Sequence, residues 1–298
     1  MTARGKLLAF FIRHLMLRHA SASRLLEFVR AVDMSLRLEE GLERLKDLKS
    51  LRPLSFIDIG ARGELHPVAE RHLDRIFLLL IEPEPEAGQD LVRRYGAHPN
   101  IAVRSVAIGS DFVEAVLYET RKPGASSTLP FGGVMSPLIQ RNHPDLSRFE
   151  VIRTHQISLQ PLSSICERAD VIKIDTQGTS LDVLKGLGDL RPFVIQLEAE
   201  TAEIYLDEST IFAIGEELGR LGYFMVHNGI DFEPLDPRSD GDYKLSIQLS
   251  GDVFFAPDLS EAGRAIVKNN EEEFLIACCM FGLQDYADWL LSKMAVLR

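Results

Sequence analysis

Short apolar runs alternate with segments of helical periodicity along the central part of the chain. The runs lie at 54–59, 75–83, 101–108, 170–175 and 191–200. They are rich in Ile, Val and Leu without strict alternation, which is typical of parallel strands covered on both faces. Further predictions are helices over 64–73, 84–95 and 209–221 and strands over 112–119, 151–159, 223–227 and 246–256. The pattern therefore predicts a doubly wound α/β sheet.

Helical segments are also expected at both ends of the chain. In residues 1–51 apolar side chains recur at three- and four-residue steps, until Arg52 and Pro53 end the pattern. The last forty residues have helical character again. We expect an N-terminal helical extension over 1–51, one α/β domain over 52–257 and a C-terminal helical tail over 258–298.

The first apolar run ends in a glycine turn, in which Asp58 is followed by Gly60 and Gly63. Glycine lets the backbone approach a ligand, and the helix behind such a turn presents free N–H groups. A dinucleotide site would place another glycine where Ala61 stands, which argues against a nicotinamide-dependent oxidoreductase. Asp58 points instead to a ligand with an ammonium group, such as S-adenosylmethionine.

A carboxylate follows the second apolar run, where Glu82 precedes Pro83. In a doubly wound sheet an acid at this position can accept both ribose hydroxyls of a nucleoside. The alternative is an ordinary helix N-cap for the segment 84–95. The glycine turn and the acid occur together, which favours the ribose role.

A second polar stretch follows the strand predicted near 171–174. It brings Asp175 to the carboxyl end of that strand, beside the first strand if the sheet is doubly wound about this point. A Gly-, Ser- and Pro-rich segment over 122–142 precedes it along the chain and is expected to be either a binding loop or plain surface.

Composition limits the kind of partner. The 298 residues carry a net charge of −11, which argues against nucleic acid as the main partner. Cys166, Cys278 and Cys279 have no metal-ligand spacing and form a poor disulfide framework, so reduced thiols are expected. These features favour a cytoplasmic protein.

The N-terminal segment differs in charge from the rest of the chain. Residues 1–25 contain five basic and no acidic side chains. The segment lacks the features of a signal peptide and its apolar core is too short to span a bilayer. A basic amphipathic helix here could cover the domain, pair with a second copy in a homodimer, or lie on the inner face of an anionic membrane.

Five short motifs together resemble the FkbM family of S-adenosylmethionine-dependent methyltransferases. The motifs occur in family order and spacing at 58–63, 81–83, 106–109, 126–129 and 172–186. The resemblance covers about residues 52–257. It implies a class I methyltransferase fold, with a seven-stranded, mostly parallel sheet and helices on both faces. It also implies methyl transfer to a hydroxyl of a sugar, polysaccharide or natural product.

The resemblance also implies roles for individual residues. Gly60 and Gly63 would cradle the methionine portion of the cofactor, Asp58 would meet its ammonium group directly or through water, and Glu82 would hold the ribose. The cofactor set is completed by Ala61, Arg62, Pro83 and Ala107, and the expected substrate-binding residues are Ser126, Ser127 and Gln177. Arg62 departs from the usual asparagine and is expected to pair either with the cofactor carboxylate or with an acidic neighbour.

Two residues are candidates for the group that takes the acceptor proton, namely Asp175 and His227. An alternative joins both to Glu198 as ligands of a divalent ion that acidifies the hydroxyl, so the need for a metal stays open. A different class of function is a catalytically silent methyltransferase-like module that recruits a partner in surface-glycan assembly.

Overall fold

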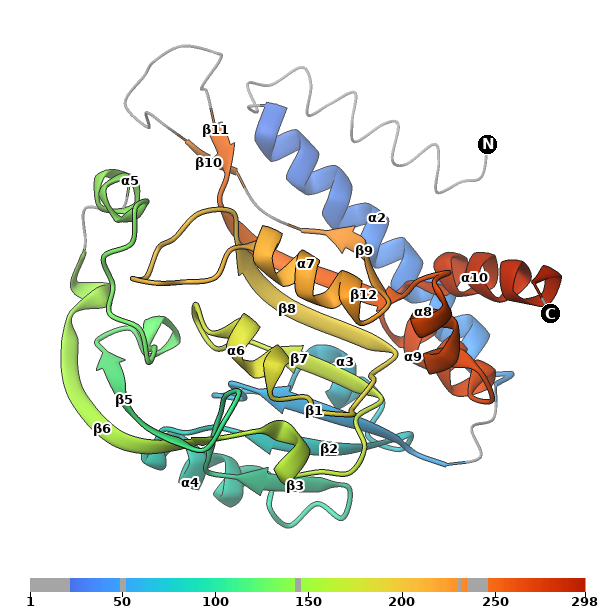
Figure 1. Cartoon of the computed structure of the whole chain (residues 1–298), viewed down its shortest axis with the longest axis horizontal. Helices are drawn as coiled ribbons and strands as arrows, with labels where there is room; N and C mark the ends of the chain where they lie inside the picture. Colours follow the sequence, from blue (N-terminus) through green and yellow to red (C-terminus); the bar gives the residue numbers. More distant parts are fainter. Residues whose placement is uncertain (1–21, 49–51, 143–145, 230–231, 235–245, 298) are drawn as a thin grey trace.

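The computed structural model describes residues 22–48, 52–142, 146–229, 232–234 and 246–297. At its centre is a seven-stranded sheet in the order β3-β2-β1-β7-β8-β12-β9 (Figure 1). β12 runs antiparallel to its two neighbours, and the other pairs are parallel. The strands are β1 Leu54–Ile59, β2 Ile76–Ile81, β3 Ile101–Arg104, β7 Val171–Ile174, β8 Val194–Glu200, β9 Tyr223–Asn228 and β12 Ser250–Pro257. This architecture confirms the predicted class I methyltransferase fold.

Helices cover both faces of the sheet, because alternate residues of each strand point to opposite sides. Leu54 and Phe56 of β1 belong to one core cluster, and Ile57 and Ile59 belong to the other. The first cluster receives side chains from α2 Ala22–Leu45, α3 Pro67–Arg71, α4 Pro85–Tyr95, α8 Glu261–Val267, α9 Glu271–Met280 and α10 Gln284–Val296. The second receives them from α6 Ser180–Lys185 and α7 Ile211–Arg220, which lie in front of the sheet in Figure 1.

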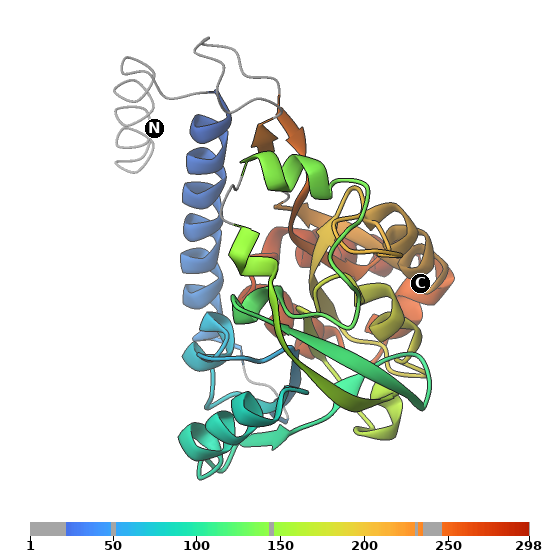
Figure 2. The same ribbon diagram turned by 90° about the vertical axis from the view of Figure 1, so that its left-hand side faces the viewer.

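A second, smaller sheet lies beside the carboxyl ends of the central strands. It has the order β4-β6-β5 and consists of β4 Ala107–Ile108, β5 Val113–Thr120 and β6 Val151–Gln160. The long antiparallel pair of β5 and β6 faces the viewer in Figure 2. The remaining short elements are η1 Pro123–Ala125, α5 Ser136–Asn142, η2 Leu146–Phe149, η3 Leu162–Ser164 and the pair β10 Phe232–Pro234 and β11 Ser246–Gln248.

Three sequence-based predictions are corrected by the structure. The strand predicted over 101–108 is two strands, since β3 joins the central sheet and β4 joins the small one. The strand predicted over 246–256 is also two strands, since β11 pairs with β10 and β12 joins the central sheet. The helix predicted over 64–73 is shorter, because α3 begins at Pro67 after His66, whose Nδ1 accepts the N–H of Val68 at 3.3 Å. Proline disfavours helical backbone at the residue before it and is well suited to the first helical position.

The described end segments pack onto the domain. α2 crosses α9 so closely that a Cβ on Gly41 would lie 2.2 Å from the carbonyl oxygen of Cys279. In Figure 2 α2 runs along one side of the molecule. None of the described helices has both the length and the apolar character needed to cross a bilayer. The basic segment expected over 1–25 falls almost wholly outside the described residues.

Candidate active site

A cavity of about 340 Å³ opens at the carboxyl ends of β1, β2 and β7. β1 lies between the other two, so the cavity sits where the chain changes direction across the sheet. Leu117 of β5, Leu159 of β6 and the segment 123–128 complete the wall. The volume falls within the range of small-molecule and cofactor sites, about 300–1,000 Å³.

The turn after β1 requires glycine at position 60. Gly60 has φ +80°, and a Cβ added there would lie 2.0 Å from the carbonyl oxygen of Asp175. The N–H groups of Gly60 and Ala61 both donate to the carbonyl oxygen of Ile81, at 2.9 and 3.1 Å. The turn therefore ties the end of β1 to the ends of β2 and β7.

Five of the eight expected cofactor residues border the cavity: Gly60, Arg62, Glu82, Pro83 and Ala107. Asp58, Ala61 and Gly63 do not border it. Asp58 and Ala61 are only 2% and 3% exposed. Neither side chain therefore borders the cavity directly, which leaves Asp58 the contact through water that was also expected.

A buried lysine occupies the place expected for a ligand's ammonium group. Lys173 Nζ lies 3.1 Å from Asp58 Oδ1 and 3.2 Å from Asp175 Oδ2. Burial alone would lower the pKa of the Lys173 ammonium, but the two carboxylates outweigh burial and raise this pKa. Asp58 therefore pairs with a side chain of the protein itself, while Asp175, whose side chain is 42% exposed, borders the cavity.

Arg62 pairs with an acidic neighbour, which was one of its two expected partners. Its guanidinium donates to Glu84 Oε2 at 2.7 Å. The Glu84 carboxylate also accepts the N–H groups of Glu86 and Ala87 and so caps α4.

Glu82 is not the helix cap that the alternative interpretation required. It is 5% exposed, borders the cavity and accepts the N–H of Glu84 at 2.9 Å. Burial raises the pKa of its carboxyl, against the lowering effect of that hydrogen bond.

The three expected substrate-binding residues all border the cavity but also hold its loops together. Ser127 Oγ donates to the carbonyl oxygen of Gln177 at 2.6 Å and accepts the N–H of Leu129 at 3.0 Å. Ser126 Oγ accepts the N–H of Thr120 at 3.1 Å. Ser127 therefore fixes the segment 123–128 to the loop that follows β7, and Ser126 fixes it to the end of β5.

Gln177 is the centre of a polar network behind this wall. Its backbone has φ +43°, and its Nε2 donates to Glu198 Oε2 and, at 3.3 Å, to Asp175 Oδ1. Its Oε1 accepts the hydroxyl of Tyr205 at 3.1 Å, and the same hydroxyl contacts the carbonyl oxygen of Ala125. Tyr205 thereby joins three loops, a role that the sequence analysis missed.

His227 lies away from this network. It belongs to β9, its ring packs edge-on against Phe254 with the ring centres 5.5 Å apart, and it does not border the cavity. The structure therefore corrects both expectations for His227. The ring is not placed to take an acceptor proton, and it forms no three-membered ligand group with Asp175 and Glu198.

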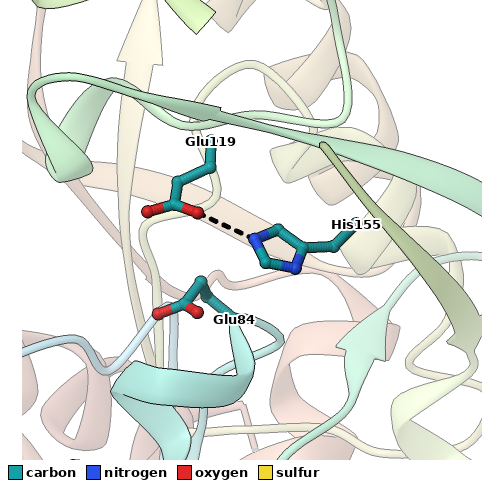
Figure 3. A group of neighbouring side chains, drawn as sticks. All are labelled: Glu84, Glu119 and His155. Atoms are coloured by element: carbon teal, nitrogen blue, oxygen red, sulfur yellow. Dashed lines mark hydrogen bonds and ion pairs between the residues drawn. The ribbon is translucent and has the colours of Figure 1, made fainter. Parts of the chain in front are cut away.

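Within the described part of the chain, the side chains whose possible ligand atoms gather within 4.8 Å are Glu84, Glu119 and His155 (Figure 3). His155 Nε2 lies 2.8 Å from Glu119 Oε2. Arg62 already pairs with Glu84, and Arg153 Nε lies 3.6 Å from Glu119. Because two guanidinium groups balance the two carboxylates, we interpret this group as a contact between the β5–β6 strand pair and the start of α4.

The comparisons with known proteins agree with this geometry. The family model described as the methyltransferase FkbM domain matches residues 58–225, more than half of the chain. No curated protein sequence matches the chain.

Several solved structures also match much of the chain at low sequence identity. Precorrin 8w decarboxylase from Methanobacterium thermoautotrophicum is 14% identical, with a TM-score of 0.30, over 73% of this chain and 89% of that one. Fibrillarin from Methanococcus jannaschii is 15% identical, with a TM-score of 0.33, over 72% and 71%. A SAM-dependent methyltransferase from Agrobacterium tumefaciens is 10% identical, with a TM-score of 0.33, over 76% and 62%. The family assignment rests on the family model, and by that match the chain belongs to the FkbM methyltransferase family.

Proposed function

We propose that the protein transfers a methyl group from S-adenosylmethionine to a hydroxyl oxygen of a sugar, polysaccharide or natural-product acceptor. The observation that carries the proposal is the row formed by Glu82, Gly60 and Asp175. These residues follow three adjacent parallel strands, and all border one cavity. A carboxylate thus stands on each side of the glycine turn.

The residues on the β2 side of the row suit the nucleoside part of the cofactor. The Glu82 carboxylate can accept hydrogen bonds from both ribose hydroxyls. Pro83, Val106, Ala107 and Leu117 form an apolar part of the wall that suits a flat base. The donor and acceptor types present therefore fit S-adenosylmethionine.

The residues on the β7 side suit a polar acceptor. Asp175, Thr176 and Gln177 border this end of the cavity. The methyl group of a sulfonium is already activated, so the protein needs to align the acceptor oxygen and receive its proton. Asp175 supplies a carboxylate at this end of the cavity. A carboxylate can receive the proton of a hydroxyl but would repel an acceptor that is already an anion, so it favours a hydroxyl acceptor.

An acceptor screen tests this proposal. The whole chain is incubated with S-adenosylmethionine and a panel of neutral glycosides, amino glycosides and hydroxylated natural products, and S-adenosylhomocysteine is measured. We expect product with at least one hydroxyl acceptor. Asp175→Asn should lower the rate by about 100-fold or more, within the range of general-base effects.

A matched control is Glu114→Gln, which changes an exposed carboxylate on β5 and should leave the rate unchanged. Cofactor binding without methylation of any acceptor would contradict the proposed reaction and would favour the catalytically silent module.

A further inference from the structure

Asp175 is one of two carboxyl groups that meet at the edge of the sheet. It follows Ile174, which pairs with Leu197 in the register of β7 and β8, so its neighbour on the adjacent strand is Glu198. One amide nitrogen, Gln177 Nε2, donates to both carboxyl groups, so the two lie beside one another. Asp175 borders the cavity, whereas Glu198 does not border it and is partly buried.

Gln177 holds the two carboxyl groups in this arrangement. Its Nε2 donates to both of them, and its Oε1 is occupied by the Tyr205 hydroxyl, so the amide has one favourable orientation. The amide can only donate to the carboxyl groups from Nε2. It therefore stabilises negative charge on the pair while leaving the contact between Asp175 and Glu198 in place.

The surroundings of the pair are acidic. The titratable groups that face it are Asp252 on β12, Glu200 on β8, Tyr205 on the loop after β8, and Lys173 on β7, whose Nζ lies 3.2 Å from Asp175. Burial, followed by the charges of Asp175 and Asp252, raises the pKa of the Glu198 carboxyl to about 7. Two acids in contact with one another titrate as a unit rather than separately.

We propose that Asp175 and Glu198 act together as the proton-accepting pair of the methyl transfer, with Asp175 at the cavity and Glu198 as the residue that stores the proton. This inference rests on the proposed function. In methyl transfer to a hydroxyl, an O–C bond forms as the S–C bond breaks, and the sulfur keeps the electron pair. The hydroxyl proton passes to Asp175 and from there to the neighbouring Glu198 carboxylate. Asp175 is left ionised beside Lys173, and the proton leaves to solvent after product release.

The pair explains where the acceptor proton goes, which neither His227 nor Asp175 alone explains. His227 does not border the cavity, so it cannot receive the proton directly. Asp175 alone would have to keep the proton 3.2 Å from the Lys173 ammonium. Glu198 offers a second carboxylate that Gln177 holds beside Asp175.

The first test needs no acceptor. Infrared difference spectra of the whole chain and of Glu198→Gln are recorded between about pH 5 and pH 9, the range that brackets neutral titration. We expect a protonated-carboxyl band that titrates near neutral pH in the natural protein and is missing in Glu198→Gln. Asp175→Asn should retain the band but shift its midpoint to lower pH, because one neighbouring negative charge is gone. Glu43→Gln, on the exposed face of α2, is the control and should leave the band unchanged.

The second test uses any hydroxyl acceptor that the screen yields. In the natural protein, the plot of rate against pH should have a rising limb near neutral pH, because the pair can accept a proton only when it is deprotonated. Glu198→Gln should lose this limb and turn over about 10- to 100-fold more slowly, with the Kd of S-adenosylhomocysteine unchanged within about twofold. Glu198→Asp should restore part of the pH dependence.

Two results would contradict the proposal that Asp175 and Glu198 accept the proton together. One is an infrared titration that is the same in the natural protein and in Glu198→Gln. The other is an unchanged pH profile of turnover in Glu198→Gln. If no acceptor is methylated, that result counts against the proposed function, and the infrared titration still decides whether the two carboxyl groups share a proton.

Discussion

The ammonium group of Lys173 lies 3.1 Å from the carboxylate of Asp58, and the two side chains are only 14% and 3% exposed. The strands β1 and β7 that carry them are paired in register, with Asp58 directly opposite Lys173. The two charges therefore neutralise each other inside the sheet, beneath the cavity.

Removing the lysine should destabilise the protein. Lys173→Met leaves the Asp58 carboxylate buried without its cation, and breaking a buried ion pair from one side costs about 3–5 kcal/mol. We expect the free energy of unfolding to fall by about this amount in chemical denaturation. The double variant Asp58→Asn with Lys173→Met should recover at least half of the loss, because it leaves no unpaired charge. A double variant as unstable as the single one would show that the pair is not the cause.

The two glycines of the turn should respond differently to alanine. Gly60 and Gly63 both have positive φ, +80° and +88°, but an added Cβ meets the Asp175 carbonyl oxygen at position 60 and finds nothing within 4 Å at position 63. Gly63→Ala should cost about 1 kcal/mol of backbone strain. Gly60→Ala should cost at least twice as much and should also weaken cofactor binding. Equal losses of thermal stability in the two variants would contradict the close approach of the strands.

Truncating Glu82 should weaken binding without unfolding the chain. Hydrogen bonds to a charged group contribute about 1.5–3 kcal/mol, so Glu82→Ala should raise the Kd of S-adenosylhomocysteine by about 10- to 100-fold. Isothermal titration calorimetry measures this directly. The control is Glu64→Gln, whose side chain is 83% exposed, and its Kd should match that of the natural protein. An unchanged Kd in Glu82→Ala would exclude the ribose role.

The buried acid pair of Glu200 and Glu208 should make stability depend on pH. Both side chains are 4% exposed. Burial, followed by the charges of Glu208 and Glu198, raises the pKa of Glu200 from 4.5 to about 9. The folded protein thus keeps a proton that the unfolded chain has lost. The stabilisation is complete below about pH 4.5 and is lost as the pH rises towards about 9.

Glu200→Gln removes this dependence on pH. The free energy of unfolding at pH 8 should rise by about 1–3 kcal/mol in the variant. Thermal unfolding measured from about pH 5 to pH 9 compares it with the natural protein and with Glu216→Gln, an exposed control on α7. Parallel curves for all three proteins would show that Glu200 is ionised in the folded state.

Periodicity was enough to predict the central sheet, because parallel strands buried on both faces are continuous apolar runs with clear ends. It failed at the run 101–108. A two-residue break at Ser105 and Val106 sends the chain to another sheet. The sequence marks this point with two consecutive polar residues, Arg104 and Ser105, but apolar residues lie on both sides of them. The glycine turn and Glu82 were recognisable because each follows a strand at a fixed spacing.

The partners of the site residues were harder to predict than the residues themselves. Lys173 had a visible signal, since a charge inside an apolar parallel strand needs a buried partner, but the sequence does not say that Asp58 lies opposite. Tyr205, on the loop after β8, and Glu198, on β8 itself, both contact Gln177 on the loop after β7. His227 looked suitable as a proton acceptor because it lies near the end of a strand. However, β9 is an edge strand of the sheet and lies far in strand order from β1.

Calorimetric titration of S-adenosylmethionine and of S-adenosylhomocysteine into the whole chain tests the central claim most directly. We predict that both compounds bind with a Kd in the micromolar range, which corresponds to a binding free energy of order −8 kcal/mol. Gly60→Arg should bind neither compound, because its side chain would fill the junction of β1 and β7. The absence of binding heat with either compound, at several temperatures and with a chain shown to be folded, would contradict the assignment of this cavity as a methyltransferase active site.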